Sequence, residues 1–210
     1  LPAQQTQALL HENVAQNSRL ILQPEHFKAT TPETRVSIAL GLEKYAETDA
    51  LEALELWHTY SKRRDFTSLE KVQITYAIAR QLIRQDHAKE AAELVSKTPD
   101  VSHPELLEAL IRESLQQQDW EKAFSWLLRL PAESLKTERW SYWQARIMEQ
   151  LKIKEINGKT PKDLYSNVAA TRSFYGFLAS DKLGIDYSLL DKPMPISKEV
   201  MAKIEAEPGI

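Results

Sequence analysis

The chain has 210 residues, 42% of them hydrophobic, which suffices for one compact domain or one length of a repeat array. Its 27 Lys and Arg against 30 Asp and Glu leave a formal net charge of -3, a field too weak and of the wrong sign to attract nucleic acid. Five glycines are too few for the positive-φ turns of a sandwich or barrel, which excludes an all-β fold.

The sequence contains no cysteine, which removes disulfides, Cys-zinc sites, iron–sulfur clusters and thiol nucleophiles, but this absence leaves the cellular compartment open. The first residues, Leu1-Pro2, include no initiator Met and no signal-peptide pattern, which suggests a processed or trimmed polypeptide. Charges interrupt every apolar run, so no transmembrane segment is expected.

The first 30 residues predict an irregular helical segment, and regular helix signals begin after them. Thr31 as N-cap and Pro32 at the first helical position predict a helix over 32–46. Thr48 or Asp49 caps the next helix, which ends in a basic run at 62–64. Because the link between these helices is short, we expect them to be antiparallel.

Residues 68–84 carry two apolar stripes, which predicts a helix buried on two sides, as in stacked helix pairs. The same periodicity predicts further helices over 88–96, 104–117, 120–130 and 135–151. Residues 152–158 alternate and end in Asn157-Gly158, which is compatible with a hairpin but better explained by a helix end followed by an Asn-Gly turn.

Three helix starts resemble one another and share a small residue, at Ala53, Ala91 and Ala123. Their spacings of 38 (91−53) and 32 (123−91) bracket the tetratricopeptide period of about 34 residues. A small residue lets two helix backbones approach closely. The sequence therefore predicts an all-α fold: a superhelical array of antiparallel helix pairs, or tetratricopeptide-like α-solenoid.

The C-terminal part does not follow the repeat spacing of the preceding helix pairs. Thr160-Pro161 begins a short helix reaching Ala170, and Ser173 caps another through Leu183, which Gly184 ends in a Schellman turn. An extended connector over 192–195 and a last helix from Ser197 are expected beyond it. The predicted organisation is an irregular helical segment over 1–30, a superhelical repeat domain over 31–187, and a connector over 188–210 toward a missing C-terminal part.

Few side chains suggest chemistry. The histidines have no metal-binding spacing, and the pairs Glu52–Glu55 and Glu90–Glu93 are typical of solvated helix faces. No phosphate-binding glycine motif occurs. We therefore assign no catalytic, cofactor-binding or metal-binding residue and expect no cofactor, and the substrate-binding residues stay unknown.

Aromatic residues gather in two places. Trp140, Trp143, Ile147 and Leu151 form one apolar helix edge, with Tyr142 on another side, and core packing is favoured over a carbohydrate platform. Around Gly176, we expect Phe174 and Phe177 in the core and Tyr175 pointing away. A glycine within a helix also predicts a close contact over it.

Two segments carry a family resemblance: Arg139-Trp-Ser-Tyr-Trp-Gln-Ala-Arg146 and Arg172-Ser-Phe-Tyr-Gly-Phe-Leu-Ala-Ser-Asp-Lys-Leu-Gly184. They resemble the sequence motifs R-W-x-Y-W-x-A-R and S-F-Y-G-x-L-A-A-D-x-L-G, which lie near the end of the ring-forming superhelix in bacterial soluble lytic murein transglycosylases. Gln117-Gln-Asp-Trp120 and Leu130-Pro131 add weaker likeness, and the whole resemblance runs over roughly residues 31–190. Ser180 replaces the family's commoner Ala.

The resemblance implies a periplasmic parent enzyme that cleaves the MurNAc-GlcNAc β-1,4 bond of peptidoglycan to 1,6-anhydro products. The family's acid/base Glu lies in a separate lysozyme-like domain, within an E-S-x-F text followed by G-L-M-Q. Here Glu113-Ser114 and Glu133-Ser134 match only its first two letters. The chain is thus expected to be inactive alone and to meet peptidoglycan strands through the full-length enzyme, with protein partners possible on the solenoid surface. The alternative is a free-standing tetratricopeptide-like protein-interaction module.

Overall fold

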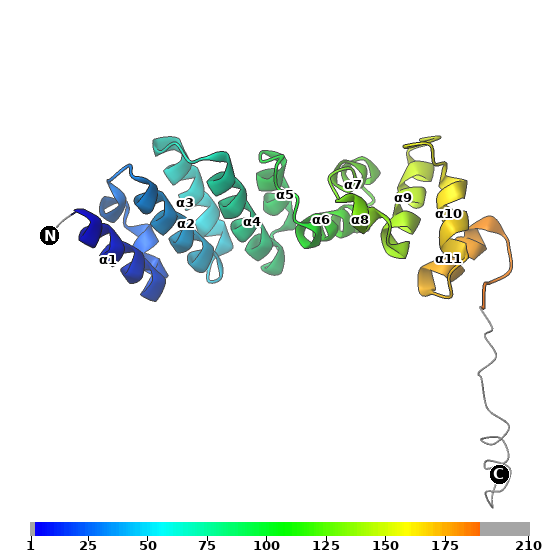
Figure 1. The fold of residues 1–210 in the computed structure, drawn as a ribbon, viewed down its shortest axis with the longest axis horizontal. Coiled ribbons are helices and arrows are strands. Elements are labelled where there is room, and N and C mark those ends of the chain that lie inside the picture. Colours follow the sequence, from blue (N-terminus) through cyan, green and yellow to red (C-terminus); the bar gives the residue numbers. More distant parts are fainter. Residues whose placement is uncertain (1–2, 190–210) are drawn as a thin grey trace, which may run out of the picture. The chain divides into compact units, whose positions relative to one another are not determined.

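A computed structural model describes residues 3–189, and these residues form eleven α-helices, two short 3₁₀ helices and one isolated β-bridge (Figure 1). The predicted all-α fold is therefore confirmed. No helix among the described residues is long and apolar enough to cross a membrane. The chain packs as two compact units that divide between Leu135 and Lys136, and each is described by itself. The expected connector at 192–195 and the helix from Ser197 lie outside the described residues.

The first unit consists of successive helices in close contact with their neighbours in sequence. Its elements are α1 (Ala3–Gln16), η1 (Ser18–Leu22), η2 (Pro24–Phe27), α2 (Pro32–Ala46), α3 (Ala50–Arg63), α4 (Ser68–Arg84), α5 (Ala88–Ser96), α6 (Pro104–Gln116), α7 (Trp120–Leu127) and α8 (Ala132–Leu135). Helix α4 packs against α5, and α6 packs against α7, which gives the expected helix pairs. Ala53, Ala91 and Ala123 are fully buried, as their small size predicts.

The helix boundaries follow from capping side chains. The side chains of Thr31 and Asp49 accept hydrogen bonds from backbone N–H groups at the starts of α2 and α3, so these predicted caps are confirmed. Thr67 and Glu70 form a capping box at the start of α4. The carboxylate of Glu70 also accepts from Arg35 Nε on α2, at 3.1 Å to each oxygen, which ties two helices together.

The α4–α5 turn and the α6–α7 turn have the same backbone conformation. After α4, Asp86 has a φ of 64°, and His87 N–H donates to Leu82 O at 2.7 Å. After α6, Gln118 has a φ of 58°, and Asp119 N–H donates to the equivalent carbonyl, that of Ser114, at 2.8 Å. These are Schellman-type helix ends in which a non-glycine residue takes the left-handed position.

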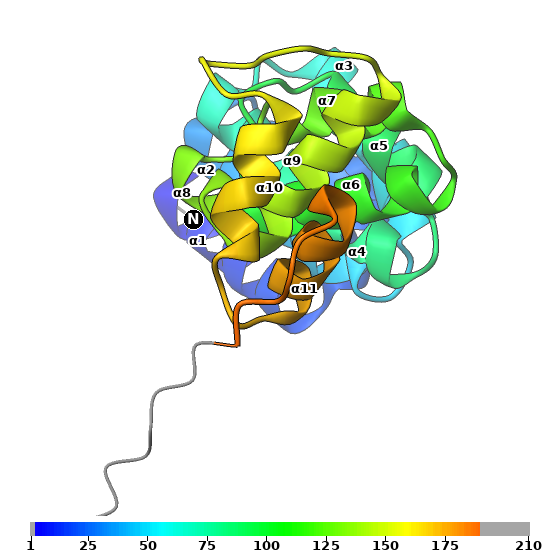
Figure 2. The same ribbon diagram turned by 90° about the vertical axis from the view of Figure 1, so that its right-hand side faces the viewer.

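The second unit contains α9 (Glu138–Gln150), α10 (Pro161–Ala169) and α11 (Phe174–Leu183), which Figure 2 brings to the front. The helix predicted over 135–151 is wrong at its start, because α8 ends at Leu135 and Thr137 caps a new helix. The Schellman turn at Gly184 is confirmed: its φ is 65°, and Ile185 N–H donates to Ser180 O at 3.1 Å.

Residues 152–158 confirm the favoured interpretation of a helix end followed by an Asn-Gly turn. Helix α9 ends at Gln150, and Asn157 and Gly158 have φ values of 51° and 75°. That turn closes a single antiparallel bridge in which Ile156 and Lys159 exchange two hydrogen bonds of 3.0 Å. The hairpin alternative survives only as this one bridge.

Helix α11 packs in a different orientation from the one predicted. Phe174 is 68% exposed, whereas Tyr175 is half-buried against the core of the second unit. The expectation that Phe174 is in the core and Tyr175 points away is therefore wrong. Phe177 is half-buried and contacts Tyr187, with ring centroids 5.1 Å apart. The buried face of α11 instead includes Tyr175 and Ala179. The small side chain of Ala179 permits closer packing between helices than the large ring of Phe174 would.

Candidate functional site

The histidines are dispersed through the first unit. His11 Nδ1 lies 3.4 Å from Ser37 Oγ, His26 bonds Gln23, and His58 lies on α3. His87 and His103 precede α5 and α6 as N-cap residues. The described residues contain no group of three side chains of His, Cys, Asp or Glu that could hold a metal ion.

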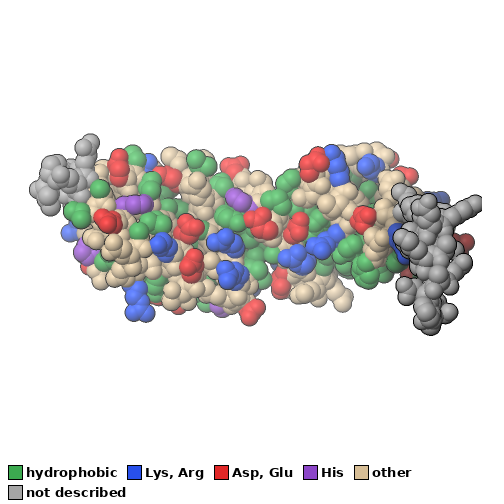
Figure 3. Space-filling model, turned by 60° about the horizontal axis from the view of Figure 1, so that its bottom comes forward, with side chains coloured by type: hydrophobic (Ala, Val, Ile, Leu, Met, Phe, Trp, Pro, Cys, Tyr) green, Lys and Arg blue, Asp and Glu red, His purple; other side chains and the backbone are tan. Residues whose placement is uncertain are grey.

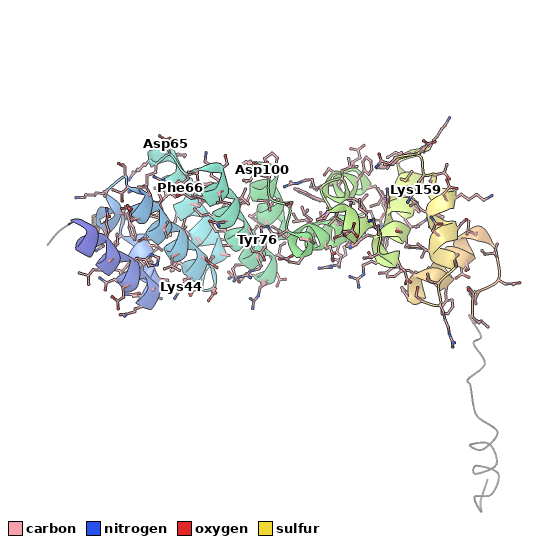
Figure 4. All side chains as sticks on the ribbon, viewed as in Figure 1. Lys44, Asp65, Phe66, Tyr76, Asp100 and Lys159 are labelled. Atoms are coloured by element: carbon pink, nitrogen blue, oxygen red, sulfur yellow. The ribbon has the colours of Figure 1, made fainter. Side chains whose placement is uncertain are left out.

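The ring of His103 stacks on Tyr76, a residue of α4 labelled in Figure 4, with centroids 3.7 Å apart. The Tyr76 hydroxyl donates to Glu105 at 2.6 Å, and this hydrogen bond raises the pKa of Tyr76 and lowers that of Glu105. Arg80 lies over the same tyrosine ring, 5.6 Å from its centroid. These contacts link α4 to the start of α6, which makes the cluster a structural one.

The candidate carboxylate pairs lie on solvated surfaces. Glu52, Glu55 and Glu93 are exposed and Glu90 is half-buried. Glu52 accepts a hydrogen bond from Tyr45, which raises the pKa of that tyrosine to about 12. Every carboxyl group in the described residues with a resolved shift has a lowered pKa, the opposite of what a glycosidase acid needs. The two pairs are poor candidates for acid–base chemistry because they lie on exposed or half-exposed helix faces.

The aromatic residues of α9 form core rather than a platform. Trp140 is 2% exposed, and Tyr142 lies among the rings of Trp143, Tyr165 and Tyr175 at centroid distances of 5.7, 5.7 and 5.6 Å. Burial, together with a hydrogen bond to Glu149, raises the pKa of Tyr165. Since a sugar platform needs an exposed indole face, the core interpretation holds for Trp140.

The structure adds a groove that sequence reasoning missed, bounded by α5, α6 and α7, the green helices in the middle of Figure 1. Its volume is about 560 Å³, within the range of small-ligand sites. The α5 wall presents Ala88, Ala92 and Ser96, one helical turn apart, and their short side chains leave the space open. That four-residue spacing of small residues was the available sequence signal.

Arg129 holds one end of this groove. Its guanidinium donates to the carbonyls of Val95, Thr98, Pro99 and Val101, at 3.3, 3.2, 3.2 and 2.7 Å, and so fixes the connection between α5 and α6. It also lies over the indole ring of Trp126, 5.1 Å from the centroid. Burial lowers the pKa of Arg129. Its carbonyl partners carry no net charge, and Arg129 forms no ion pair with a carboxylate of residues 3–189.

The rim of the groove carries both signs of charge. Lys122 pairs with Asp119 at 3.4 Å, and Glu113 accepts from Gln117 at 2.7 Å. Within residues 3–189, Lys89 has no ion-pair partner. Figure 3 shows the same interspersion of Lys and Arg with Asp and Glu on the face that it displays. Such a surface suits a ligand with localised charges better than a polyanion.

The fold thus defines a class: an α-helical protein built from consecutive antiparallel helix pairs. No family model matches the chain. A soluble lytic murein transglycosylase of Escherichia coli (strain K12) is 24% identical over 185 residues, which are 86% of this chain and 28% of that protein.

Solved structures agree with that match. An inactive mutant of the lytic transglycosylase Slt from Pseudomonas aeruginosa is 32% identical, with a TM-score of 0.75 over 99% of this chain and 33% of its own. A 70-kDa soluble lytic transglycosylase in complex with bulgecin A has the same fold, at 23% identity and a TM-score of 0.70, over 98% of this chain and 34% of its own. The resemblance to soluble lytic murein transglycosylases is confirmed, and the chain spans about a third of the length of the relatives it matches.

Proposed function

We propose that this chain is the non-catalytic, α-superhelical and ring-forming portion of a soluble lytic murein transglycosylase. The observation that carries the proposal is the likeness to the Pseudomonas aeruginosa enzyme over 99% of this chain but only 33% of that one. The motifs at 139–146 and 172–184 support it independently. The parent enzyme would cleave the MurNAc-GlcNAc bond of peptidoglycan to 1,6-anhydro products, using a lysozyme-like domain outside this chain.

In this proposal, residues 31–187 form a tetratricopeptide-like repeat domain and 188–210 lead toward the catalytic part. The domain would help to build a ring that surrounds or guides the glycan strand in the periplasm, with its outer surface available to protein partners. The Glu70 carboxylate, which ties α4 to α2 through Arg35, and the buried Trp140 support a scaffolding role.

A turbidity assay on murein sacculi tests the proposal. The purified 210-residue chain is expected to leave sacculi intact, whereas the full-length product of the same reading frame should clear them and release 1,6-anhydro-muropeptides. Release of such products by the 210-residue chain alone would contradict the scaffolding role. A full-length reading frame without a lysozyme-like domain would favour a free-standing protein-interaction module instead.

A further inference from the structure

The side of α11 that faces away from the core of the second unit is apolar. Phe174 is 68% exposed, and the half-buried Phe177 lies one helical turn further along the same side. Of the ten residues of α11, only Asp181 and Lys182 carry a charge. A helix that is hydrophobic all round is normally buried on both sides, yet the described residues bury mainly the side that includes Ala179.

The connector that follows α11, orange in Figure 2, extends this apolar surface. Tyr187 folds back onto the helix: its ring lies 5.1 Å from that of Phe177, and its hydroxyl donates to Asp181 at 2.7 Å. Ile185, Tyr187 and Leu189 are 53, 50 and 55% exposed. Grouped apolar side chains on a surface, unlike single scattered ones, mark a site of interaction. We define the α11 patch as Phe174, Phe177, Ile185, Tyr187 and Leu189.

Residues 190–210 follow the α11 patch directly, and their sequence contains the pattern of a short amphipathic helix. Ser197 is a favoured N-cap residue, and Pro208-Gly209 is a pair that ends helices. Ile196 and Met201 have the spacing of a hydrophobic staple. At 3.6 residues per turn, one apolar face about 100° wide contains Val200, Met201 and Ile204. The rest of the circumference contains every charged residue, namely Lys198, Glu199, Lys203, Glu205 and Glu207.

This segment needs a surface, and the α11 patch is within its reach. An isolated helix of about ten residues is not stable in water without a packing partner. Pro193 and Pro195 keep the link over 190–196 extended, and seven extended residues span up to about 23 Å, more than the length of about 15 Å of α11 itself. Such a short tether gives an effective concentration of about millimolar, so a weak apolar contact is enough.

We propose that residues 197–207 form an amphipathic helix that docks on the α11 patch, with its apolar face against Phe174 and Phe177. Branched and thioether side chains pack well on aromatic rings. A sugar suits this surface less, because the hydroxyl of Tyr187 and the carboxylate of Asp181 already bind each other. The docked helix fixes the direction in which the chain leaves the second unit. This inference concerns the chain itself and does not rest on the proposed function.

Paramagnetic nuclear magnetic resonance on the 210-residue chain tests the docking. The sequence has no cysteine, so Ala206→Cys, on the side opposite the apolar face, takes a single nitroxide label. We expect this label to broaden the amide signals of α11 and of residues 185–189, in comparison with the same sample after reduction of the nitroxide. A mixture of nitroxide-bearing chains with isotope-labelled, nitroxide-free chains reports on contacts between molecules, and we expect no broadening in it.

Substitutions on both surfaces identify the contact. Ile204→Asp in the apolar face and Phe174→Asp in the α11 patch should each abolish the broadening. The matched controls should keep it: Ala202→Asp introduces the same residue on the opposite side of the segment, and Leu69→Asp replaces an equally exposed residue (67%) on α4.

Circular dichroism on each variant confirms that the rest of the chain remains folded. Absence of broadening at α11 in the parent chain would overturn the proposal. So would broadening that persists in Ile204→Asp and Phe174→Asp, or broadening in the mixed sample, which would assign the α11 patch to a second copy of the chain.

Discussion

Gly176, the third residue of α11, lies against the backbone of the α10–α11 connection. A Cβ atom at this position would be 2.1 Å from Thr171 O and 2.9 Å from Thr171 Oγ1. Real Cβ contacts almost never fall below 3.0 Å, so the carbonyl must move by roughly 1 Å to admit a methyl group. Because the obstacle is backbone rather than the end of a flexible side chain, the connection itself has to shift.

Two effects of Gly176→Ala oppose each other. Replacing glycine within a helix gains up to about 1 kcal/mol from helix propensity. Overpacking against fixed atoms costs about 1–3 kcal/mol. The steric effect dominates at 2.1 Å, so we expect a net loss of about 1–2 kcal/mol in the free energy of unfolding.

Urea unfolding followed by circular dichroism measures this loss, and amide hydrogen exchange in α10 and α11 locates it. Gly184→Ala is the control: a Cβ there meets nothing within 4 Å, and its cost of about 1 kcal/mol comes only from the φ of 65°. It should leave the protection of α10 unchanged, whereas Gly176→Ala should reduce it. A Gly176→Ala chain as stable as the parent would refute the close-contact reasoning.

Further expectations concern side chains whose environment only the structure shows. Phe174→Ala should cost less than about 1 kcal/mol and Tyr175→Ala about 2–4 kcal/mol in urea unfolding, because the first ring is exposed and the second packs on the core; equal costs would contradict this orientation. Arg129→Lys should destabilise the chain by about 1–3 kcal/mol and speed amide exchange between α5 and α6, since an ammonium cannot satisfy four carbonyls. Burial alone would raise the pKa of Glu70, but hydrogen bonds from Thr67 and Arg35 lower it overall, so stability present above the ordinary glutamate pKa of 4.5 should be lost as the pH falls through the lower folded value; Glu70→Gln should flatten that acid limb of the unfolding curve. Gln118→Gly should stabilise the chain by up to about 1 kcal/mol, because it relieves a φ of 58°, and an unchanged urea midpoint would argue against strain there.

The sequence determined most of the local structure, because caps and helix ends depend on residues close together in the chain. Thr31-Pro32, Asp49, Thr160-Pro161 and Ser173 begin the helices that they predict, and Gly184 ends one. Apolar spacing and the small residues at Ala53, Ala91 and Ala123 predicted the helix pairs, because a helix presents every third or fourth residue to its neighbour.

Only the tertiary structure decided which of two competing faces of a short helix is buried and where the helix pairs leave space. On α11, the stripes through Phe174 and through Tyr175 have similar periodicity, and the outcome depended on how the helix packs against α9 and α10 in three dimensions. The groove at Trp126 was hidden for the same reason, because its walls come from three helices.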